Sequence, residues 1–358
     1  MPSADSGFSI QNLDFELPEE LIAQHPTERR EDARLMVLRR KTREIVHAAI
    51  PQLGDWLHPH DLLILNDTKV LPARFLARRR TGGAVPGLFL EEMQPGKWRI
   101  LLQGSARLRS GETIAIVDRA GETLALRLGR PLGPGEWIVE IEPAGDAESL
   151  LARFGQTPLP PYIRRPPGGG ADEESDRDRY QTVYARRAGA VAAPTAGLHL
   201  TSAFLDTLRD RGVDCAFVTL HVGVGTFKPI VVDCLADHTM HEEWFDLPAA
   251  TEEAVRNCRA LGGRVVAVGT TSARVLESAA QPGTNHVAAR TGRTSIFIHP
   301  PQHLAVVDAL LTNFHLPRST LLAMIMALAG VEFVRGAYEQ AVANRYRFYS
   351  YGDAMFVE

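Results

Sequence analysis

Four histidines stand beside glycines, hydroxyl groups or carboxylates: His221, His238, His241 and His315. An imidazole has an ordinary pKa of about 6.5, so each of these side chains suits proton transfer near neutral pH. His238 and His241, in HTMHEEW, could also share a helix face as metal ligands. The stretch lacks the H-E-x-x-H pattern, however, and three ligands at zinc-site spacing are not evident. We therefore predict hydrogen-bonding histidines in a substrate cleft and no metal site.

Three stretches place small and hydroxyl residues where a helix is expected to begin: AAPTAGLHLT, VGTTSARVLES and LLTNFHLPRSTLL. A helix start favours a carboxylate or phosphate, and glycine lets the backbone approach a ligand closely. Ordinary capping and tight packing of small side chains would produce similar patterns. With YQTVYA and TLHVGVGTFKP, these stretches supply the candidate substrate-binding residues Tyr180, Tyr184, Thr195, Gly197, His199, Gly223, Gly225, Thr226, Lys228, Thr270, Thr271, Ser272, Arg274, Glu277, Asn313, Ser319 and Thr320.

The glycines of TLHVGVGTFKP follow an expected strand, VDCAFVTL, as in a dinucleotide-binding loop. The third small residue and the following helix start of that fingerprint are missing, so we exclude NAD binding. Lys228 could meet an anion, although a surface lysine needs no function. In VGTTSARVLES, Arg274 and Glu277 are three residues apart and are expected to share one helix face.

The C-terminal stretch YRFYSYGDAM mixes aromatic rings with arginines, a combination that suits stacking on bases and contact with phosphates. A core strand with alternating aromatics would look the same. The candidate RNA-binding residues are Arg164, Arg165, Arg345, Tyr346, Arg347 and Tyr351, and Arg74, Arg78, Arg79 and Arg80 add possible phosphate contacts.

The composition is that of a globular protein, with 45% hydrophobic and 23% charged residues. A net charge of -4 supplies no global attraction for nucleic acid, so a polyanion must meet a local basic patch. Three cysteines without a C-x-x-C pair fit a reducing compartment, and the start of the chain lacks signal-peptide features. The longest apolar run, from Leu321 to Val331, is too short for a membrane span, which needs roughly 20 residues. We expect a cytoplasmic protein.

Strand-like and helical segments alternate at both ends of the chain, whereas short strand-like runs alone fill the region between them. This pattern predicts a large α/β domain with an inserted small all-β, barrel-like domain. The predicted boundaries are 1–72 for the first part of the large domain, 73–145 for the barrel and 146–358 for the second part. In the second part, residues 157–179 are rich in proline, glycine and charge, and we expect a mobile loop there. This loop is either a linker or a flap that orders on a substrate.

The combined motifs closely resemble the S-adenosylmethionine:tRNA ribosyltransferase-isomerase family of queuosine biosynthesis. The matching stretches run from the first seventy residues to the C-terminus: LNDTKVLPARF, LPPYIRR, YQTVYA, AAPTAGLHLT, TLHVGVGTFKP, HTMHEEW, VGTTSARVLES, LLTNFHLPRSTLL and YRFYSYGDAM. Departures are mild: Leu200 stands where the family often has Phe, and Arg318 where Lys is common.

The resemblance implies a tRNA-modifying enzyme that acts on 7-aminomethyl-7-deazaguanine at the wobble position. The family transfers and isomerises the ribosyl part of S-adenosylmethionine onto the aminomethyl group, which gives epoxyqueuosine, adenine and methionine. S-adenosylmethionine is thus consumed as a co-substrate, and no recycled cofactor is implied. The implied partners are S-adenosylmethionine and the anticodon stem-loop of tRNA, without a membrane. The family fold, an α/β domain with a barrel insertion, agrees with the expected elements.

This reaction needs a base for the acidic proton beside the sulfonium and an acid for the departing adenine. Our hypothesis is that the four histidines supply these roles, with Glu242 or Asp353 orienting one of them. Two other classes stay open from the residues. A metal-dependent hydrolase would centre on His238 and His241, and a non-catalytic RNA-binding protein would need only the basic and aromatic surface. The sequence leaves the oligomeric state open.

Overall fold

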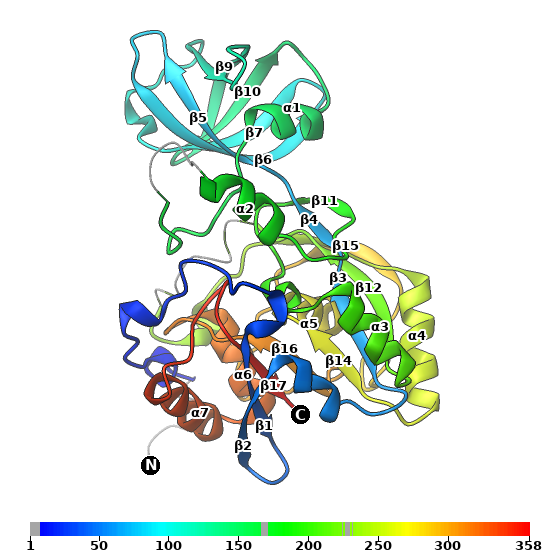
Figure 1. The fold of residues 1–358 in the computed structure, drawn as a ribbon. Coiled ribbons are helices and arrows are strands. Elements are labelled where there is room, and N and C mark those ends of the chain that lie inside the picture. The colour runs from blue at the N-terminus through cyan, green and yellow to red at the C-terminus, as the bar shows by residue number, and fades with distance from the viewer. Residues whose placement is uncertain (1–7, 166–170, 224, 226–229, 231) are drawn as a thin grey trace, which may run out of the picture.

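A computed structural model describes residues 8–165, 171–223, 225, 230 and 232–358. Within these ranges the chain forms a large α/β domain and a closed β-barrel, drawn at the bottom and top of Figure 1. The predicted fold class is therefore confirmed.

The large domain is built on a nine-stranded sheet, counted over the described residues, in the order β15-β13-β12-β3-β14-β16-β17-β1-β2. Its four central strands, β12, β3, β14 and β16, are parallel to one another. They are nearly continuous apolar runs because both faces of the sheet are covered. The strands are β1 (Arg34–Arg39), β2 (Glu44–Ala49), β3 (Leu62–Asn66), β12 (Asp214–Leu220), β13 (Glu243–Leu247), β14 (Val265–Val268), β15 (Arg290–Thr294), β16 (Ala309–Asn313) and β17 (Ala354–Val357).

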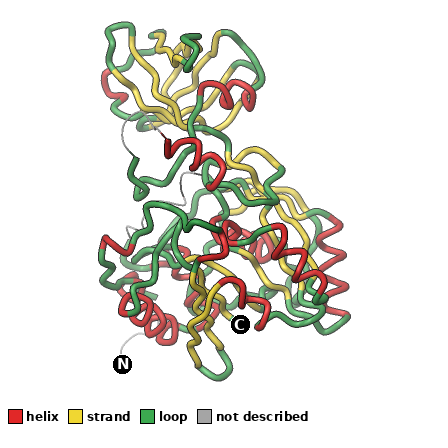
Figure 2. The backbone as a smooth tube through the Cα atoms, in the orientation of Figure 1, coloured by secondary structure: helices red, strands yellow, loops and turns green. Residues whose placement is uncertain are grey.

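Helices cover both faces of this sheet (Figure 2). One face packs against α4 (Ala249–Ala260), α5 (Thr270–Ser278), α6 (Thr320–Ala329) and α7 (Val331–Ala343). The other face packs against α3 (Ser202–Asp210), η4 (Ile50–Asp55) and η6 (Thr195–His199). Further short 3-10 helices are η1 (Ile10–Leu13), η2 (Glu19–Leu21), η3 (Arg30–Asp32), η5 (Ser105–Arg107) and η8 (Leu235–Asp237). In the described ranges no single helix could cross a membrane; α6 and α7 together have the length and composition, but a bend of 119° separates them.

The barrel closes in the order β10-β7-β6-β5-β8-β9. Its strands are β5 (Arg74–Arg79), β6 (Ala84–Gln94), β7 (Lys97–Leu102), β8 (Thr113–Val117), β9 (Thr123–Gly133) and β10 (Glu136–Glu142). Along β7, Trp98, Ile100 and Leu102 are buried while the residues between them are more exposed, so a period of two fills the interior. Helix α1 (Ala147–Phe154) packs Leu151 and Phe154 onto the barrel core.

Two short parallel strands, β4 (Thr68–Val70) and β11 (Arg187–Ala190), lie between the barrel and the large sheet (Figure 1). Helix α2 (Ala171–Arg179) lies beside them. The predicted loop 157–179 is therefore wrong for residues 171–179, which are helical. This helix buries the carboxylate of Asp176, which binds the Arg165 guanidinium through two hydrogen bonds and accepts another from the Tyr351 hydroxyl. These distant partners stabilise a segment that has little apolar surface of its own. The exact domain boundaries and the mobility of the rest of the loop stay predictions.

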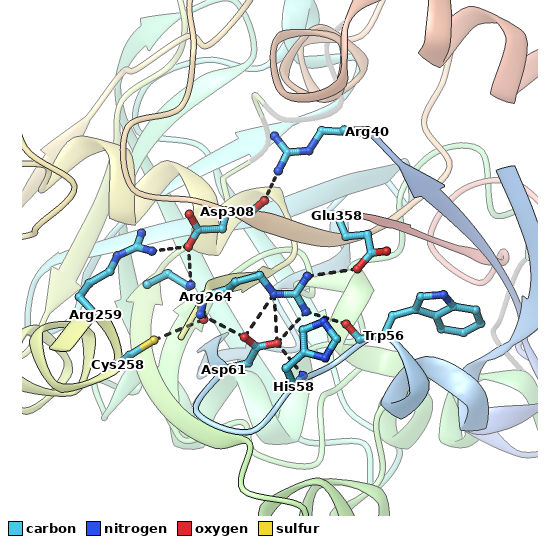
Figure 3. Close-up of polar contacts among 10 residues, drawn as sticks. Arg40, Trp56, His58, Asp61, Cys258, Arg259, Arg264, Asp308 and Glu358 are labelled. Atoms are coloured by element: carbon cyan, nitrogen blue, oxygen red, sulfur yellow. Dashed lines mark hydrogen bonds and ion pairs between the residues drawn. The ribbon is translucent and has the colours of Figure 1, made fainter. Parts of the chain in front are cut away.

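An ion network closes the amino edge of the parallel sheet (Figure 3). The buried carboxylate of Asp61, just before β3, accepts hydrogen bonds from the backbone and guanidinium of Arg264 and from the His58 backbone N-H. The same guanidinium reaches Glu358 at 3.1 Å and the Trp56 carbonyl at 2.6 Å. The network ties strand starts together at the edge opposite the one described next.

Candidate active site

The predicted polar clusters meet at the carboxyl edge of the four parallel strands. His221 follows β12, Asp67 follows β3, Gly269 follows β14 and Phe314 follows β16. Because parallel strands end at the same edge, loops from distant parts of the sequence are brought together there. This edge is where an open α/β sheet commonly binds its ligand.

A cavity of about 270 Å³ opens at this edge. Its described lining residues are Pro161, Tyr162, Ala192, Ala193, Pro194, Thr195, Ala196, Val222, Gly269, Thr270, Thr271, Thr312, Asn313, His315, Leu316, Pro317, Arg318, Ser319, Leu321, Tyr349 and Ser350. Most of them are apolar or uncharged. Another cavity, of about 380 Å³, lies between residues 12–16 and helices α6 and α7, away from the strand ends, and we place no site there.

Asn313 and His199 form a buried pair at the edge of the cavity. The Asn313 amide nitrogen lies 3.0 Å from the Tyr349 carbonyl oxygen and 3.2 Å from His199 Nε2. Burial lowers the pKa of His199 to about 4, so its imidazole is neutral near neutral pH. His199 therefore holds Asn313 in place rather than carrying a charge.

His315 is the one histidine of the predicted acid–base set that lines the cavity, as far as the described residues show. Its Nε2 lies 2.8 Å from the Thr312 hydroxyl, and its backbone N-H donates to the Tyr338 hydroxyl at 3.1 Å. Burial lowers the pKa of His315 to about 3. A base this weak holds a proton poorly near neutral pH, so the geometry favours a hydrogen-bonding role.

The start of α5 contributes hydroxyl groups to the cavity. Gly269 adopts a φ of 89° between β14 and the helix, a conformation that glycine accepts without strain. Thr270 and Thr271 line the cavity, and the Thr271 hydroxyl accepts from the Asn66 amide at 3.1 Å. Ser272 points elsewhere, because its hydroxyl donates to the Val268 carbonyl inside the core.

The start of α6 forms the opposite wall. Ser319 caps this helix by accepting from the Leu322 N-H at 3.2 Å. Thr320 is the first residue of the helix and does not line the cavity. Arg318 adopts a φ of 56°, lines the rim and forms an ion pair with Asp14. A helix start and a guanidinium both favour a negative charge, so this end of the cavity is the one that suits an anion.

Arg274 is buried on α5 and pairs with Glu243 at the start of β13. Glu277, which was expected on the same helix face as Arg274, accepts the backbone N-H groups of Ala305, Val306 and Val307. The other oxygen of Glu243 accepts the Gly223 N-H at 2.8 Å. The ion pair thereby anchors the loop that follows β12, one residue beyond the cavity-lining Val222.

The other three histidines lie outside the described lining of the cavity. His221 Nδ1 is 2.8 Å from the Thr68 hydroxyl, and its ring stacks on Trp244 with centroids 4.8 Å apart. Burial, assisted by the charge of Arg187, lowers its pKa. Gly189 packs against this ring so closely that a Cβ there would come within 2.6 Å of Nε2.

His238 is half-buried against the Phe297 ring, and burial lowers its pKa. His241 is exposed beside Gly225, where a Cβ would come within 2.3 Å of the imidazole. Glu242 is also exposed, whereas its neighbour Glu243 is buried. Thr226 and Lys228 lie outside the described residues. Among the described residues, no group of three or more His, Cys, Asp or Glu side chains could hold a metal ion.

The predicted tyrosines Tyr180 and Tyr184 lie outside the described lining of the cavity. Tyr180 is fully buried and packs edge-on against Tyr351. Gly197 makes room for the Tyr184 hydroxyl, which would lie 2.0 Å from a Cβ at that position. Neither ring lines the cavity, although Thr195 and Ala196 of the same stretch do. These tyrosines pack within the protein, and their substrate-binding role stays a prediction.

The C-terminal stretch is mostly core, which corrects the RNA-binding prediction. Tyr346 and Tyr351 are buried, so their rings cannot stack on bases. Asp353 accepts from the backbone N-H groups of Arg34 and Arg347 and from the Arg34 side chain. These contacts join Asp353 to arginines and to the backbone, and none of the described ones is to a histidine, so the orienting role of Asp353 stays a prediction without support. The alternation of aromatic residues reflects a packed segment.

Two of the predicted RNA-binding arginines are also engaged inside the protein. Arg165 forms the buried pair with Asp176, and the Arg347 side chain donates to the His25 carbonyl. Arg164 and Arg345 keep exposed side chains and form surface pairs with Glu19 and Glu20, respectively. On the barrel, Arg74, Arg78 and Arg80 are exposed, and Arg79 pairs with Glu112.

Four hydroxyl-bearing lining residues were not among the candidates: Tyr162, Thr312, Tyr349 and Ser350. The rings of Tyr162 and Tyr349 lie 3.9 Å apart and form an aromatic wall beside Asn313. Both tyrosines belong to stretches that the sequence singled out, LPPYIRR and YRFYSYGDAM. The positive φ of Tyr349, 74°, could not be read from its residue type.

The stability of the protein is expected to fall as the pH drops below about 6.5. Both His199 and His315 bind a proton more weakly in the folded chain, so acid favours the unfolded chain. The stability that each neutral imidazole contributes is fully present above pH 6.5, the pKa of an unfolded histidine. This stability is lost as the pH falls toward the folded pKa, which is about 4 for His199 and about 3 for His315. The slope should reach ~1.4 kcal/mol per pH unit for each histidine.

Urea unfolding of wild type and His315→Gln between these pH values checks this expectation. The variant should show a shallower slope, and substitution of the exposed His303 by Gln should leave it unchanged. Equal slopes in wild type and His315→Gln would contradict the assignment of a buried neutral imidazole.

The fold and the cavity define an α/β enzyme with an inserted β-barrel. A solved structure described as S-adenosylmethionine tRNA ribosyltransferase from Thermotoga maritima matches 97% of this chain and 100% of its own, with a TM-score of 0.54 and 35% identity. The model of the family described as "Queuosine biosynthesis protein" matches residues 10–357. The chain therefore belongs to the queuosine biosynthesis protein family, which confirms the resemblance seen in the sequence motifs.

Curated relatives agree over nearly the full length. A protein of Trichlorobacter lovleyi is 48% identical over 97% of this chain and 99% of its own length, and a Thermotoga maritima protein is 45% identical with the same coverage. Both are named S-adenosylmethionine:tRNA ribosyltransferase-isomerase. The predicted enzyme class, a transferase-isomerase, is thus confirmed.

Proposed function

We propose that this enzyme transfers and isomerises the ribosyl part of S-adenosylmethionine onto 7-aminomethyl-7-deazaguanine at the tRNA wobble position. The products are epoxyqueuosine-tRNA, adenine and methionine. The observation that supports this function best is the cavity at the carboxyl edge of the sheet, since it combines an anion-binding end, neutral polar groups and an aromatic wall. S-adenosylmethionine carries a matching carboxylate and adenine. It is consumed as a co-substrate, and we propose no recycled cofactor.

In this arrangement the carboxylate of the donor lies at the start of α6, near Arg318. The hydroxyls of Thr270 and Thr271 face the middle of the donor. His315 gives a hydrogen bond inside the cavity, and His221, His238 and His241 stay candidates for the base that removes the proton beside the sulfonium. His221 is adjacent in sequence to the cavity-lining Val222, so we rank it first among the three candidate bases.

For the acceptor, we propose that tRNA binds through its anticodon stem-loop and that Arg164 and Arg345 contact its phosphates. Both guanidinium groups are exposed and free to exchange a surface carboxylate for a phosphate. A tRNA substrate also places the enzyme in the cytoplasm, without a membrane partner.

Replacing Arg164 and Arg345 together by Gln is expected to weaken tRNA binding and to reduce its salt dependence. Each lost phosphate contact should lower the slope of log affinity against log salt by about 0.7. Titrations of tRNA at several salt concentrations measure this slope. Arg209→Gln, which removes an exposed arginine on α3 with a similar surface partner, is the matched control. An unchanged affinity and slope in the double variant would remove both residues from the RNA surface.

Product analysis tests the function itself. The purified protein is incubated with S-adenosylmethionine and tRNA that carries the aminomethyl-deazaguanine, and nucleosides and small products are analysed by mass spectrometry. Epoxyqueuosine with stoichiometric adenine and methionine is the expected result. Bound but unmodified tRNA would contradict the proposal and favour a binding protein.

A further inference from the structure

We propose that the amide oxygen of Asn313 accepts a hydrogen bond from the exocyclic amine of the donor's adenine and so selects a 6-aminopurine over a 6-oxopurine. This inference rests on the proposed function, because it assigns the cavity to S-adenosylmethionine. It adds the orientation of the donor and the residue that determines base specificity.

The orientation of the Asn313 amide is fixed by its neighbours. A backbone carbonyl can only accept a hydrogen bond, so the atom 3.0 Å from the Tyr349 carbonyl oxygen must be the NH2 group. The same NH2 group faces Nε2 of His199, which accepts from it in the neutral imidazole. Oδ1 is therefore the amide atom left for a ligand.

The Asn313 side chain is 1% exposed, and its Oδ1 has no hydrogen-bond partner in the described structure. A buried acceptor without a donor costs about 1–3 kcal/mol, and proteins rarely keep one without a reason. Because Asn313 lines the cavity, a bound ligand can supply the missing N-H group. A ligand with a donor at this point gains the bond and removes the cost together.

The chemistry of the lining decides which N-H group fits. S-adenosylmethionine offers two, the adenine amine and the methionine ammonium. No Asp or Glu lines the cavity over the described residues, and its one charged lining side chain there is Arg318. An ammonium beside Asn313 would lack a counter-charge, whereas a neutral flat heterocycle needs none.

The surfaces around Asn313 fit such a heterocycle. Ala193, Pro194, Leu316 and the Tyr349 ring provide apolar contact area. His315, neutral near neutral pH, adds a polar edge without adding a charge. With adenine at Asn313, the methionine carboxylate is free to reach the start of α6 and Arg318, where its charge is matched.

Binding of donor analogues to the protein without tRNA tests the inference. Calorimetry compares S-adenosylmethionine with its 6-oxo analogue, S-inosylmethionine, and with an analogue that lacks the α-amino group. We expect the 6-oxo analogue to bind at least ~100-fold more weakly, since its carbonyl faces Oδ1 and leaves that oxygen unpaired. If the desamino analogue alone loses this affinity, Oδ1 serves the ammonium and the inference is overturned.

Variants separate Asn313 from the rest of the cavity. In Asn313→Leu the preference for the 6-amino donor should shrink to within about ten-fold, whereas Asn344→Leu, an exposed asparagine after α7, should keep the wild-type preference. If Asn313→Leu does not fold, the wild-type comparison still decides. Equal wild-type affinity for the 6-amino and 6-oxo donors overturns the inference. If the wild-type protein prefers the 6-amino donor but forms no product from tRNA, the proposed function is overturned instead.

Discussion

Replacing Arg274 by methionine is expected to lower the free energy of unfolding by about 3–5 kcal/mol, because it removes the guanidinium that pairs with the buried Glu243 carboxylate. The side chains of Arg274 and Glu243 are only 4% and 5% exposed. The Glu243 carboxylate also accepts the Gly223 N-H, so a displaced Glu243 no longer anchors the loop beside Val222. We therefore expect the affinity for the donor to fall in the protein that remains folded. Chemical denaturation and donor calorimetry measure the two effects.

The double variant Arg274→Met with Glu243→Leu is the informative companion. Removing both charges should restore most of the lost stability, since apolar residues of similar size often replace a buried pair without loss. Arg256→Met, which breaks an exposed pair with Glu253 on α4, should change stability by less than ~1 kcal/mol. A single variant as stable as wild type would show that the pair is not desolvated as described.

A similar loss, about 3–5 kcal/mol, is expected for Asp61→Ala at the opposite edge of the sheet. This carboxylate is 1% exposed and binds both the guanidinium and the backbone N-H of Arg264 (Figure 3). Its removal leaves both groups without this partner and leaves Glu358 as the remaining carboxylate on the partly buried guanidinium. The midpoint of chemical denaturation should fall accordingly.

Donor affinity distinguishes the two edges of the sheet. Below its unfolding transition, Asp61→Ala should bind S-adenosylmethionine like wild type, because the cavity lies at the carboxyl edge. Asp206→Ala, which removes the exposed partner of Arg209, serves as the control for loss of a surface carboxylate. Wild-type stability of Asp61→Ala would refute the structural role of the network.

The sequence predicts the place of the site better than its contacts. Glycines and hydroxyls at the strand-to-helix corners marked the loops that meet at the carboxyl edge, and Thr270, Thr271, Asn313 and His315 line the cavity there. The parallel order of the strands brings them together, and strand and helix patterns already imply that order.

Local sequence patterns do not predict contacts between side chains that are far apart in the sequence. Successive strand residues face opposite sides, so at the start of β13 Glu243 is buried while Glu242, one residue earlier, is exposed. The partner of Arg274 lies on that strand and not one turn along its own helix. Likewise, Tyr346 and Tyr351 alternate with arginines as an RNA-binding stretch would, yet tertiary packing buries both rings.

The most direct test of the account follows the atoms of the donor. S-adenosylmethionine with isotopically heavy ribosyl carbons and a deuterated methyl group is incubated with the enzyme and tRNA carrying the aminomethyl-deazaguanine, and the modified nucleoside is analysed by mass spectrometry. The account predicts that the nucleoside carries all the heavy ribosyl carbons and no deuterium, with the deuterated methyl group retained in methionine. A nucleoside that carries the deuterated methyl group, or no label, would contradict it.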